Sequence, residues 1–444
     1  MITYIKINGF KSFHNFEMEF TPLTVIAGVN ASGKSNLFDA LQLLARLAET
    51  DLKTAFSEQR GDPNELFTQY GDNEYASQME FTIETIVNRT ITDNWGGQSE
   101  LKYTRFKYHL VIKRISNATG FEDLSIVYEH LVNLKHNEDR WVNKYIDKDV
   151  LEFWTPKLLK TRRQKPYIDT ENENNILSIV LHPDGTGGNR KIFPAKKASQ
   201  TILSSINSVD FPHVFAVKEE MRSWKFLQLN PEDLREPTRQ DIGLRDTITQ
   251  SGKNLAAALF RIKQDDEYNL TEISRNLNNL LPNLTEVNVY DDRANRQFVI
   301  KIKGEDGREF SSRVLSEGTL RLLTLCILQQ DRQHTGLLCF EEPENGIHPF
   351  RIKTMANLLK ELSVDFEDTE MSLRQVIVNT HSPVLVSELI QWQHDKNVSI
   401  WLSQINTLVA QIDAKKRKLK ITKILPIAKE IEKQLTLDRL FFIL

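Results

Sequence analysis

The segment GVNASGKS at residues 28–35 constrains the fold of this 444-residue chain more than any other feature. It follows the apolar run Thr24–Ala27, which is typical of a central parallel strand that is covered on both faces. From Asn36 onward, apolar residues such as Leu37 and Leu41 recur at helical spacing. A strand, a turn that contains glycine and a helix, in this order, predict an α/β fold.

The residues of this segment fit the binding of phosphate groups, and a chance match is disfavoured because a strand precedes it and a helix follows it. Gly28 and Gly33 permit backbone angles that curl N–H groups around phosphate oxygens, and the helix directs its N-terminus at the anion. The Lys34 ammonium group would neutralise β- and γ-phosphates, and the Ser35 hydroxyl would ligate Mg²⁺. The candidate nucleotide-binding residues of the segment are Gly28, Asn30, Ser32, Gly33, Lys34, Ser35 and Asn36.

Composition excludes several other classes of protein. The chain is 40% hydrophobic and 26% charged, and its formal net charge of −3 argues against a uniformly basic coat for nucleic acid. Cys326 and Cys339 lie in apolar runs, which predicts buried, reduced thiols without a disulfide framework. No stretch reaches the roughly 18 apolar residues of a membrane span, and the N-terminus lacks the apolar region of a signal peptide. We expect a cytoplasmic protein with no membrane partner.

A second set of polar residues follows the apolar run Leu337–Phe340, where the sequence reads EEPE at residues 341–344. Ligands of open α/β sheets bind at the carboxyl ends of the strands, so these acids would face the phosphates. Glu341 would contribute to the Mg²⁺ shell, and Glu342 would orient or deprotonate the attacking water. An acidic loop after a strand is usually only solvated, so this interpretation depends on the phosphate-binding segment upstream.

Two shorter motifs complete the pattern. Ser316 and Gly318 belong to LSEGT, a turn that opens a predicted helix and offers a second helix N-terminus to an anion. Alone, that motif would be no more than an N-capped helix. His381 belongs to THSP, which follows the apolar run Val376–Val378. A lone histidine at a strand end is more often structural, but at this edge of the sheet we expect it to contact the γ-phosphate.

In the order P-loop, LSEG, EEPE and THSP, the four motifs resemble those of the ABC ATPase superfamily. GFKSF at residues 9–13, EEPENGIHP and THSP resemble its RecF-like branch, which is related to SMC heads. That branch includes the ATPase halves of OLD-family nucleases and ATPases of bacterial anti-phage systems. The resemblance is strong over about the first 60 residues and over residues 315–386, and it is looser between them.

The resemblance implies an ABC-type ATPase head with a mixed sheet and an inserted β-rich and helical lobe. It implies the cofactors ATP and Mg²⁺ and a head-to-tail sandwich, in which ATP held by residues 28–35 of one subunit is closed by Ser316 and Gly318 of another. The expected assembly is therefore a homodimer or a higher homo-oligomer.

The resemblance also assigns roles to single residues. Glu341, Glu342 and His381 match the Walker B metal ligand, the catalytic carboxylate and the switch histidine. Many ABC ATPases have aspartate where this chain has Glu341, and the extra methylene moves the metal ligand, so we expect slow, regulated hydrolysis. Asn345 falls in the loop that would cross the dimer interface, and Gln69 is a candidate for the glutamine that links the metal to the β-rich lobe.

The motifs and the periodicity predict three regions. Residues 1–65 and 310–400 would form a split ATPase lobe, residues 66–309 an insertion, and residues 401–444 a basic and apolar tail that docks a partner. Within the insertion, alternation predicts an antiparallel meander, helical spacing predicts two helices, and a hairpin follows them. The ranges are Met79–Val87, Arg105–Arg114 and Leu124–Leu134 for the meander, Lys253–Lys263 and Leu270–Leu281 for the helices, and Glu286–Tyr290 and Gln297–Lys303 for the hairpin.

Two basic clusters and an apolar end leave alternatives open. The clusters could bind the phosphates of DNA or RNA, and a solvated basic surface is at least as good an interpretation. The final LFFIL could pack on its own domain, dock a partner or mark a cut. The clusters are Lys157, Lys160, Arg162, Arg163 and Lys165, and Lys415, Lys416, Arg417, Lys418 and Lys420.

Two functions follow as expectations. In the first, the ATPase assembles through ATP sandwiches and regulates a separately encoded effector, a nuclease, in anti-phage defence, because too few residues follow His381 for a nuclease module. In the second, it is a RecF-like repair or recombination ATPase that binds DNA directly. A nucleotide-locked structural subunit that does not hydrolyse ATP is a third, weaker alternative.

Overall fold

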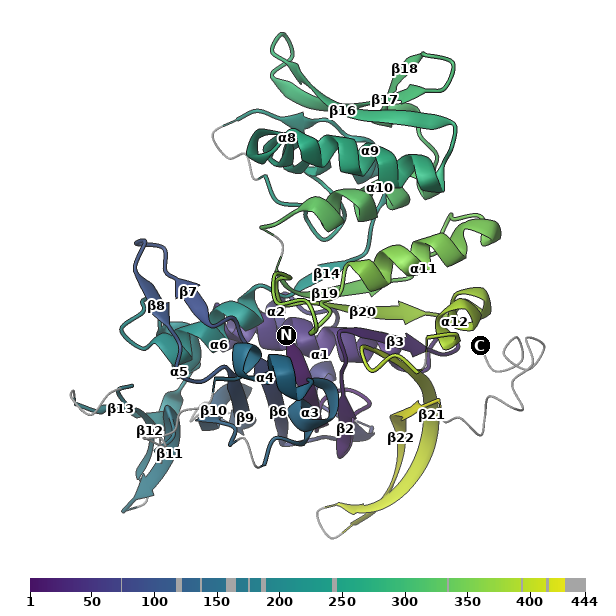
Figure 1. Ribbon diagram of the computed structural model, residues 1–444. Helices are drawn as coiled ribbons and strands as arrows, with labels where there is room; N and C mark the ends of the chain where they lie inside the picture. Colours follow the sequence, from purple (N-terminus) through teal and green to yellow (C-terminus); the bar gives the residue numbers. More distant parts are fainter. Residues whose placement is uncertain are drawn as a thin grey trace.

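The computed structural model describes residues 1–72, 74–116, 122–135, 138–156, 165–174, 176–184, 189–241, 246–333, 335–392, 394–412 and 415–427. In Figure 1, helices lie between a six-stranded sheet and an eight-stranded sheet, and a smaller sheet lies at the top of the view.

The six-stranded sheet carries the predicted phosphate-binding segment. Its order is β14-β19-β20-β3-β21-β22, and every neighbouring pair except β21-β22 is parallel. Strand β3 lies between β20 and β21, and all of its residues are buried, which confirms the predicted central parallel strand. The strands are β3 (Leu23–Ala27), β14 (Lys225–Leu227), β19 (Gly336–Glu341), β20 (Arg374–Thr380), β21 (Val398–Ile412) and β22 (Lys415–Pro426).

Alternate residues of this sheet enter two different cores, because successive side chains of a strand point to opposite faces. Ile26, Cys339 and Ile377 pack with α1 and α6 against the eight-stranded sheet. Val25 and Phe340 pack with the helices of the opposite face. The first group of helices is α1 (Lys34–Leu47), α2 (Leu52–Ser57) and α6 (Pro212–Arg222), and the second is α8 (Leu255–Asp265), α9 (Tyr268–Leu280), α10 (Glu317–Gln330), α11 (Ile352–Glu361) and α12 (Pro383–Ile390).

Both cysteines are buried in these cores, as predicted. Burial raises the pKa of the Cys326 thiol to about 12 and that of Cys339 well above its usual value. Both groups are therefore thiols rather than reactive thiolates at neutral pH.

The eight-stranded sheet has the order β13-β12-β11-β10-β9-β6-β1-β2 and antiparallel neighbours. It confirms the predicted meander, which is β6, β9 and β10. The first two strands of the chain pair with this meander, and the predicted domain boundaries stay a prediction. The strands are β1 (Ile2–Asn8), β2 (Phe16–Glu19), β6 (Gln78–Ile86), β9 (Arg105–Ser116), β10 (Glu122–Asn133), β11 (Ile168–Glu173), β12 (Ile176–Leu181) and β13 (Lys191–Pro194).

The small sheet confirms the predicted hairpin, and α8 and α9 confirm the two predicted helices beside it. The hairpin strands are β16 (Leu284–Asp292) and β17 (Gln297–Gly304), and β15 (Thr238–Arg239) and β18 (Glu309–Ser311) pair with β17. The remaining elements are β4 (Gln69–Gly71), β5 (Glu74–Tyr75), β7 (Thr90–Thr92), β8 (Gln98–Glu100), α3 (Arg140–Tyr145), α4 (Lys148–Trp154), α5 (Ile202–Ser205), α7 (Pro231–Arg235), η1 (Pro63–Leu66), η2 (Ala195–Lys197), η3 (Ser312–Val314) and η4 (Pro349–Arg351).

Residues 398–426 form a long hairpin that the sequence interpretation did not contain. Strand β21 pairs with β3 over Val398–Leu402 and with β22 over Trp401–Ile412, and the hairpin curves away from the body in Figure 1. Lysine and arginine at most positions in the first half of β22 hide the alternation that would have predicted this strand. The final LFFIL, and the first basic cluster apart from Lys165, lie outside the described residues.

The lengths and polarity of the helices bear on the expected absence of a membrane partner. Among the described residues, no helix has the length and apolar character needed to cross a bilayer.

Candidate functional site

The segment at residues 28–35 forms a compact loop between β3 and α1. The Gly28 N–H donates to the Thr380 carbonyl at 3.3 Å, which ties the loop to the end of β20. Gly33 precedes α1 with φ = +92°, a left-handed conformation that favours glycine. A Cβ on Gly33 would collide with the Thr422 side chain. Conformation and space therefore both require glycine at this position.

Lys34 lies at the centre of the loop. Its ammonium group is buried and donates to the carbonyl oxygens of Gly28 at 2.6 Å and Val29 at 2.9 Å. Burial lowers the pKa of Lys34, and the negative charges of Glu342, Glu344 and Glu341 oppose that shift. The acids predicted from EEPE therefore lie close enough to act on the charge of the loop lysine.

The ends of β19, β20 and β3 bring two of the three predicted metal ligands, Ser35 and Glu341, close to Asn379. The parallel register places Glu341 beside Asn379, and Thr380 beside Ala27. The Asn379 amide donates to the Ser35 Oγ at 3.4 Å. Ser35 and Glu341 thus lie on either side of Asn379, at the edge where ligands of α/β sheets bind.

Glu342 and His381 form a close pair at the same edge. The Nδ1 atom of His381 lies 2.7 Å from Oε1 of Glu342, and the Asn345 amide donates to Oε2 at 2.8 Å. Glu342 has φ = +47°, so its side chain leaves the direction of β19, which ends at Glu341. Both carboxylate oxygens of Glu342 therefore have a partner within the protein.

Several buried polar atoms at this edge have no hydrogen-bond partner within the part of the chain that the structure describes. They are Ser32 Oγ, Asn379 Oδ1 and Glu344 Oε2, and the other oxygen of Glu344 accepts from the Thr380 hydroxyl. Burial raises the pKa of Glu344. Buried polar groups normally find partners, so a donor and acceptor set of this kind fits a polar ligand such as a Mg²⁺-bound phosphate.

Sequence reasoning missed three charged residues beside the site. Arg60 reaches Glu341 at 3.4 Å and Asp39 at 3.6 Å, and Asp39 also pairs with Lys11 at 2.6 Å. Lys11 belongs to the GFKSF motif, but Arg60 and Asp39 carry no motif, because they approach the site only through the packing of α1 against the segment after α2.

A groove of about 520 Å³ opens beside the loop. Its lining includes Lys11, Ser12 and Gln69, together with lysines of β22. Ser12 accepts from the Asn36 amide at 2.7 Å, which connects this groove to α1. Gln69 is exposed and its amide donates to the Gly71 carbonyl, and no hydrogen bond among the described residues joins it to Ser35 or Glu341. Its role as a metal link stays a prediction, as does a nucleotide contact of the exposed Asn30.

The hairpin also holds the loop. Ser403 Oγ of β21 donates to the Ser32 carbonyl at 3.0 Å, and Thr422 Oγ1 of β22 approaches the same oxygen at 3.4 Å. Thr422 Oγ1 also lies 2.6 Å from Ser12 Oγ. Two strands from the end of the chain thus fix the backbone of the phosphate-binding loop.

Ser316 and Gly318 of LSEGT, which were predicted to close the ATP site, lie at the start of α10. Ser316 is exposed and caps α10 by accepting from the Thr319 N–H at 3.3 Å. Gly318 is buried, and a Cβ there would collide with the Gly346 carbonyl. No hydrogen bond among the described residues joins Ser316 or Gly318 to residues 28–36.

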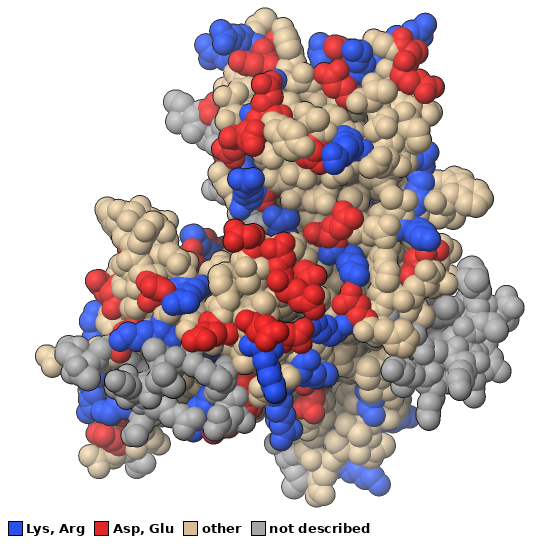
Figure 2. Space-filling model, in the orientation of Figure 1, with Lys and Arg blue, Asp and Glu red and all other residues tan. Residues whose placement is uncertain are grey.

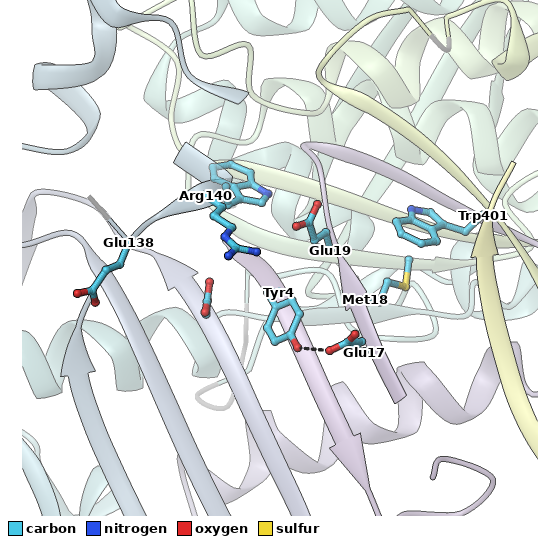
Figure 3. Close-up of a pocket in the computed structure, with 9 residues that line it drawn as sticks. Tyr4, Glu17, Met18, Glu19, Glu138, Arg140 and Trp401 are labelled. Carbon is cyan, nitrogen blue, oxygen red and sulfur yellow. Dashed lines mark hydrogen bonds between the residues drawn. The ribbon is translucent and has the colours of Figure 1, made fainter. Parts of the chain in front are cut away.

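A second pocket of about 520 Å³ lies between β1, β2, α3 and the start of β21, and it does not suit a triphosphate. Figure 3 shows the carboxylates of Glu17, Glu19 and Glu138 around this pocket, with Trp401 on the side opposite Glu138. Figure 2 shows that acidic side chains also form a band across the middle of this face of the molecule. Repulsion between like charges disfavours a phosphate group in this pocket.

Comparison with known proteins places this geometry in a family. The family model described as "AAA domain, putative AbiEii toxin, Type IV TA system" matches residues 23–387, which include all four motifs. The fold is similar to the SMC head domain from Thermotoga maritima, with 13% identity, a TM-score of 0.39 and coverage of 96% of this chain and 99% of that chain. It is also similar to an SMC head bound to the C-winged helix domain of ScpA, with 14% identity, a TM-score of 0.45 and coverage of 97% and 99%.

A third similar structure is an SMC head with an extended coiled coil, bound to the C-terminal domain of ScpA derived from Pyrococcus furiosus. It has 14% identity, a TM-score of 0.43 and coverage of 98% of each chain. No curated protein matches the chain. The predicted membership of the P-loop ATPase superfamily is confirmed. Because the family model spans most of the chain, the protein belongs to the AAA-domain family whose description names the AbiEii toxin of a Type IV TA system.

Proposed function

We propose that the protein binds ATP with Mg²⁺ at residues 28–35 and hydrolyses it slowly, and that ATP joins two copies of the chain. The observation that carries the proposal is the pair of Glu342 and His381, 2.7 Å apart, at the sheet edge that also holds Lys34. A carboxylate and an imidazole beside a phosphate-binding loop can together orient and deprotonate a water molecule.

Each residue has a distinct task in this proposal. The N–H groups of the loop and the Lys34 ammonium group bind the phosphates, and Ser35 and Glu341 hold Mg²⁺. The metal ion supplies neutralisation of phosphate charge. Glu342 accepts the proton of the attacking water, and His381 positions Glu342 and contacts the terminal phosphate.

The contacts of Glu342 support slow and regulated turnover. Its two oxygens are already engaged by His381 and Asn345, so water must displace one of them before Glu342 acts as a base. Asn345 lies in the loop whose next residue, Gly346, packs on Gly318. A partner that moves this loop would therefore change the availability of the base.

The surface around LSEGT supports assembly into a homodimer or a higher homo-oligomer. Ser316 is exposed, Val314 beside it is 71% exposed, and Phe350, which follows the EEPE loop, is 92% exposed. Exposed apolar groups around a polar turn are typical of a contact surface. In the assembly, Ser316 and Gly318 of one copy close the ATP held by the other.

The assembly acts as a sensor that regulates a separate effector, a nuclease, in anti-phage defence. The description of the family, which names a toxin of a Type IV TA system, supports a role in a system of several components. Purification of the tagged protein from its native host, with and without ATP, tests this part. Recovery of the chain alone under both conditions contradicts it.

A second candidate function, direct binding of DNA, is favoured by the hairpin. Lys416, Lys418 and Lys420 are exposed on one face of β22, and neither β21 nor β22 contains an acidic residue. Such a face can neutralise backbone phosphates. Duplex binding that weakens with salt and that K416Q/K418Q/K420Q removes would support it over the effector function.

Replacement of Glu342 tests the ATPase proposal. E342Q should lower phosphate release by roughly 10²- to 10⁴-fold, the usual contribution of a general base, while ATP binding remains. The same variant should accumulate an ATP-dependent dimer in size-exclusion chromatography with light scattering. E286Q, in an exposed pair with Lys303 on the small sheet, is the matched control and should leave both unchanged. Unchanged phosphate release in E342Q would exclude the assigned role.

A further inference from the structure

The outer part of the eight-stranded sheet is weakly joined to the rest by its backbone. The pairing of β9 with β10 runs from Phe106 opposite Asn133 to Ser116 opposite Glu122. Strands β11 and β12 pair along their whole length. Between β10 and β11, the described residues contribute the single pair Leu131–Ile168. The ribbon β11–β13 extends away from the sheet in Figure 1, so side chains add to the few backbone bonds at this junction.

Three potential metal ligands gather on one face of the ribbon beside this junction. A carboxylate oxygen of Asp169, one of Glu171 and a ring nitrogen of His182 all lie within 4.8 Å of one another. Asp169 and Glu171 are two residues apart on β11 and therefore share a face. His182 directly follows β12 and is buried. Two strands of the ribbon thus converge on one point.

A second histidine approaches Asp169 from the other side of the junction. His130 lies on β10, and its Nε2 atom is 3.7 Å from Oδ1 of Asp169. The neutral form of an imidazole ring can ligate a metal through either ring nitrogen.

We propose that Asp169, Glu171, His182 and His130 bind one divalent transition-metal ion, with Zn²⁺ as the best fit, and that this ion fastens the β11–β13 ribbon to β10. Two imidazoles and two carboxylates make a mixed nitrogen and oxygen set, which suits Zn²⁺ better than Mg²⁺ or Ca²⁺. Bonds of about 2.0–2.2 Å to a tetrahedral ion require ligand atoms roughly 3.5 Å apart. The ligand atoms of Asp169, Glu171 and His182 lie within 4.8 Å of one another, and rotation of the two partly exposed carboxylates would bring them towards that spacing.

The other contacts of Asp169 and Glu171 are compatible with an ion. Glu171 pairs with Arg190 at 3.2 Å, but the Arg190 side chain is 49% exposed. Exposed pairs contribute little free energy, so an ion can replace this one. The Thr170 N–H donates to Oδ1 of Asp169, which orients the carboxylate and leaves Oδ2 for the metal. Such a hydrogen bond to a ligand is usual around bound metals.

The ribbon is also attached through Thr170 and Glu129. The Thr170 hydroxyl donates to the Glu129 carbonyl at 2.8 Å and accepts from the Glu129 N–H at 2.9 Å. The Thr170 side chain thus makes two hydrogen bonds to the backbone of β10, where a regular strand pair would use backbone groups of β11. An ion beside it would add a second, stronger link across the same gap, and its role is structural and independent of ATP.

Zinc binding to the full chain tests the proposal. Protein freed of metal with a chelator is titrated with Zn²⁺, Mn²⁺ or Mg²⁺ without nucleotide, and bound metal and thermal unfolding are measured. We expect one tightly bound Zn²⁺ per chain, weaker binding of Mn²⁺ and Mg²⁺, a higher melting temperature, and slower amide exchange in β11 and β12. D169N and H182Q should each weaken Zn²⁺ binding by about 100-fold or more, the upper end of the loss from removing a group that only orients a ligand.

Three controls separate this site from others. H348Q changes an exposed histidine at η4, and E341Q changes the proposed Mg²⁺ ligand, so both should keep full Zn²⁺ affinity. D169N should keep its ATP affinity, which verifies that it folds. The proposal is overturned if Zn²⁺ does not bind, if D169N and H182Q bind it as the wild type does, or if E341Q loses it.

Discussion

At the scale of single residues, the backbone conformation of Glu342 directs the adjacent side chains of Glu341 and Glu342 to different partners. Glu341 ends β19 in extended conformation and faces Asn379 and Arg60. Glu342 has φ = +47° and turns towards His381. A non-glycine residue with positive φ is uncommon and costs of order 1–3 kcal/mol. The contacts of Glu342 with His381 and Asn345 stabilise this conformation.

A buried carboxylate far from the nucleotide site gives a prediction at the same scale. Burial raises the pKa of Glu129 to about 7, although it accepts N–H groups of Leu203 and Ile202 and the Tyr108 hydroxyl. Its folded pKa exceeds the unfolded value of 4.5, so the folded state holds the proton more tightly. This contribution to stability is complete below pH 4.5 and is lost as the pH rises to about 7.

Chemical denaturation between pH 4.5 and 7.5 checks this prediction. The wild type should lose stability across the window with a slope of up to about 1.4 kcal/mol per pH unit from this group. E129Q should lack that part of the slope. E138Q, which changes an exposed glutamate of the same region, is the control and should follow the wild type. Equal slopes in wild type and E129Q would show that Glu129 does not carry the effect.

At the scale of elements, the phosphate-binding loop depends on strands that arrive last in the sequence. The hairpin β21–β22 contributes Ser403 and Thr422 to the Ser32 carbonyl, and Thr422 also occupies the space beside Gly33. The motif alone prescribes the conformation of the loop, but the hairpin limits its motion.

Removal of these two hydroxyls tests that dependence. S403A/T422V should weaken ATP binding by roughly 5- to 150-fold, because each of the two bonds contributes about 0.5–1.5 kcal/mol. Calorimetric titration with ATP measures the change. T407V, at an exposed position of β21, serves as the matched control. If the double variant folds and binds ATP like the control, the hairpin does not support the loop.

The helices and strands that the sequence predicted differ from those that it missed in the clarity of their hydrophobic period. It predicted β3, the meander β6, β9 and β10, helices α8 and α9 and the hairpin β16–β17, because each has a clear hydrophobic period. It missed β22, where lysines mask the period, and β14, whose three residues are too few to show one. It missed Arg60 because a long side chain can reach a site from a segment that carries no motif.

At the scale of the whole molecule, the parts of the proposed ATP site lie in two places. Ser316 and Gly318 begin α10, and no hydrogen bond among the described residues connects them to the loop at residues 28–36. Head-to-tail pairing of two copies would bring each loop to the other copy's LSEGT turn and complete two equal sites.

Mixing two inactive variants tests this arrangement. K34A lacks a working loop, and S316R lacks a working turn, so each should be inactive alone. A mixed dimer contains one site with an intact loop and an intact turn. Equal mixing should therefore restore roughly a quarter of wild-type phosphate release, as expected for random pairing in a two-fold dimer. S316R should retain ATP binding, and no recovery on mixing would contradict assembly in trans.

The sequence by itself determined the chemistry of the site. The order of strand, glycine loop and helix, and the acids and histidine at strand ends, are local patterns, and local backbone preferences and hydrophobic period determine them. Only the tertiary structure decided which side chains meet. The contact of Glu342 with His381, the approach of Arg60 to Glu341, the hydrogen bonds of β22 to the loop and the approach of His130 to Asp169 all join residues far apart in the chain. Such contacts depend on strand register and packing, which no single segment of sequence encodes.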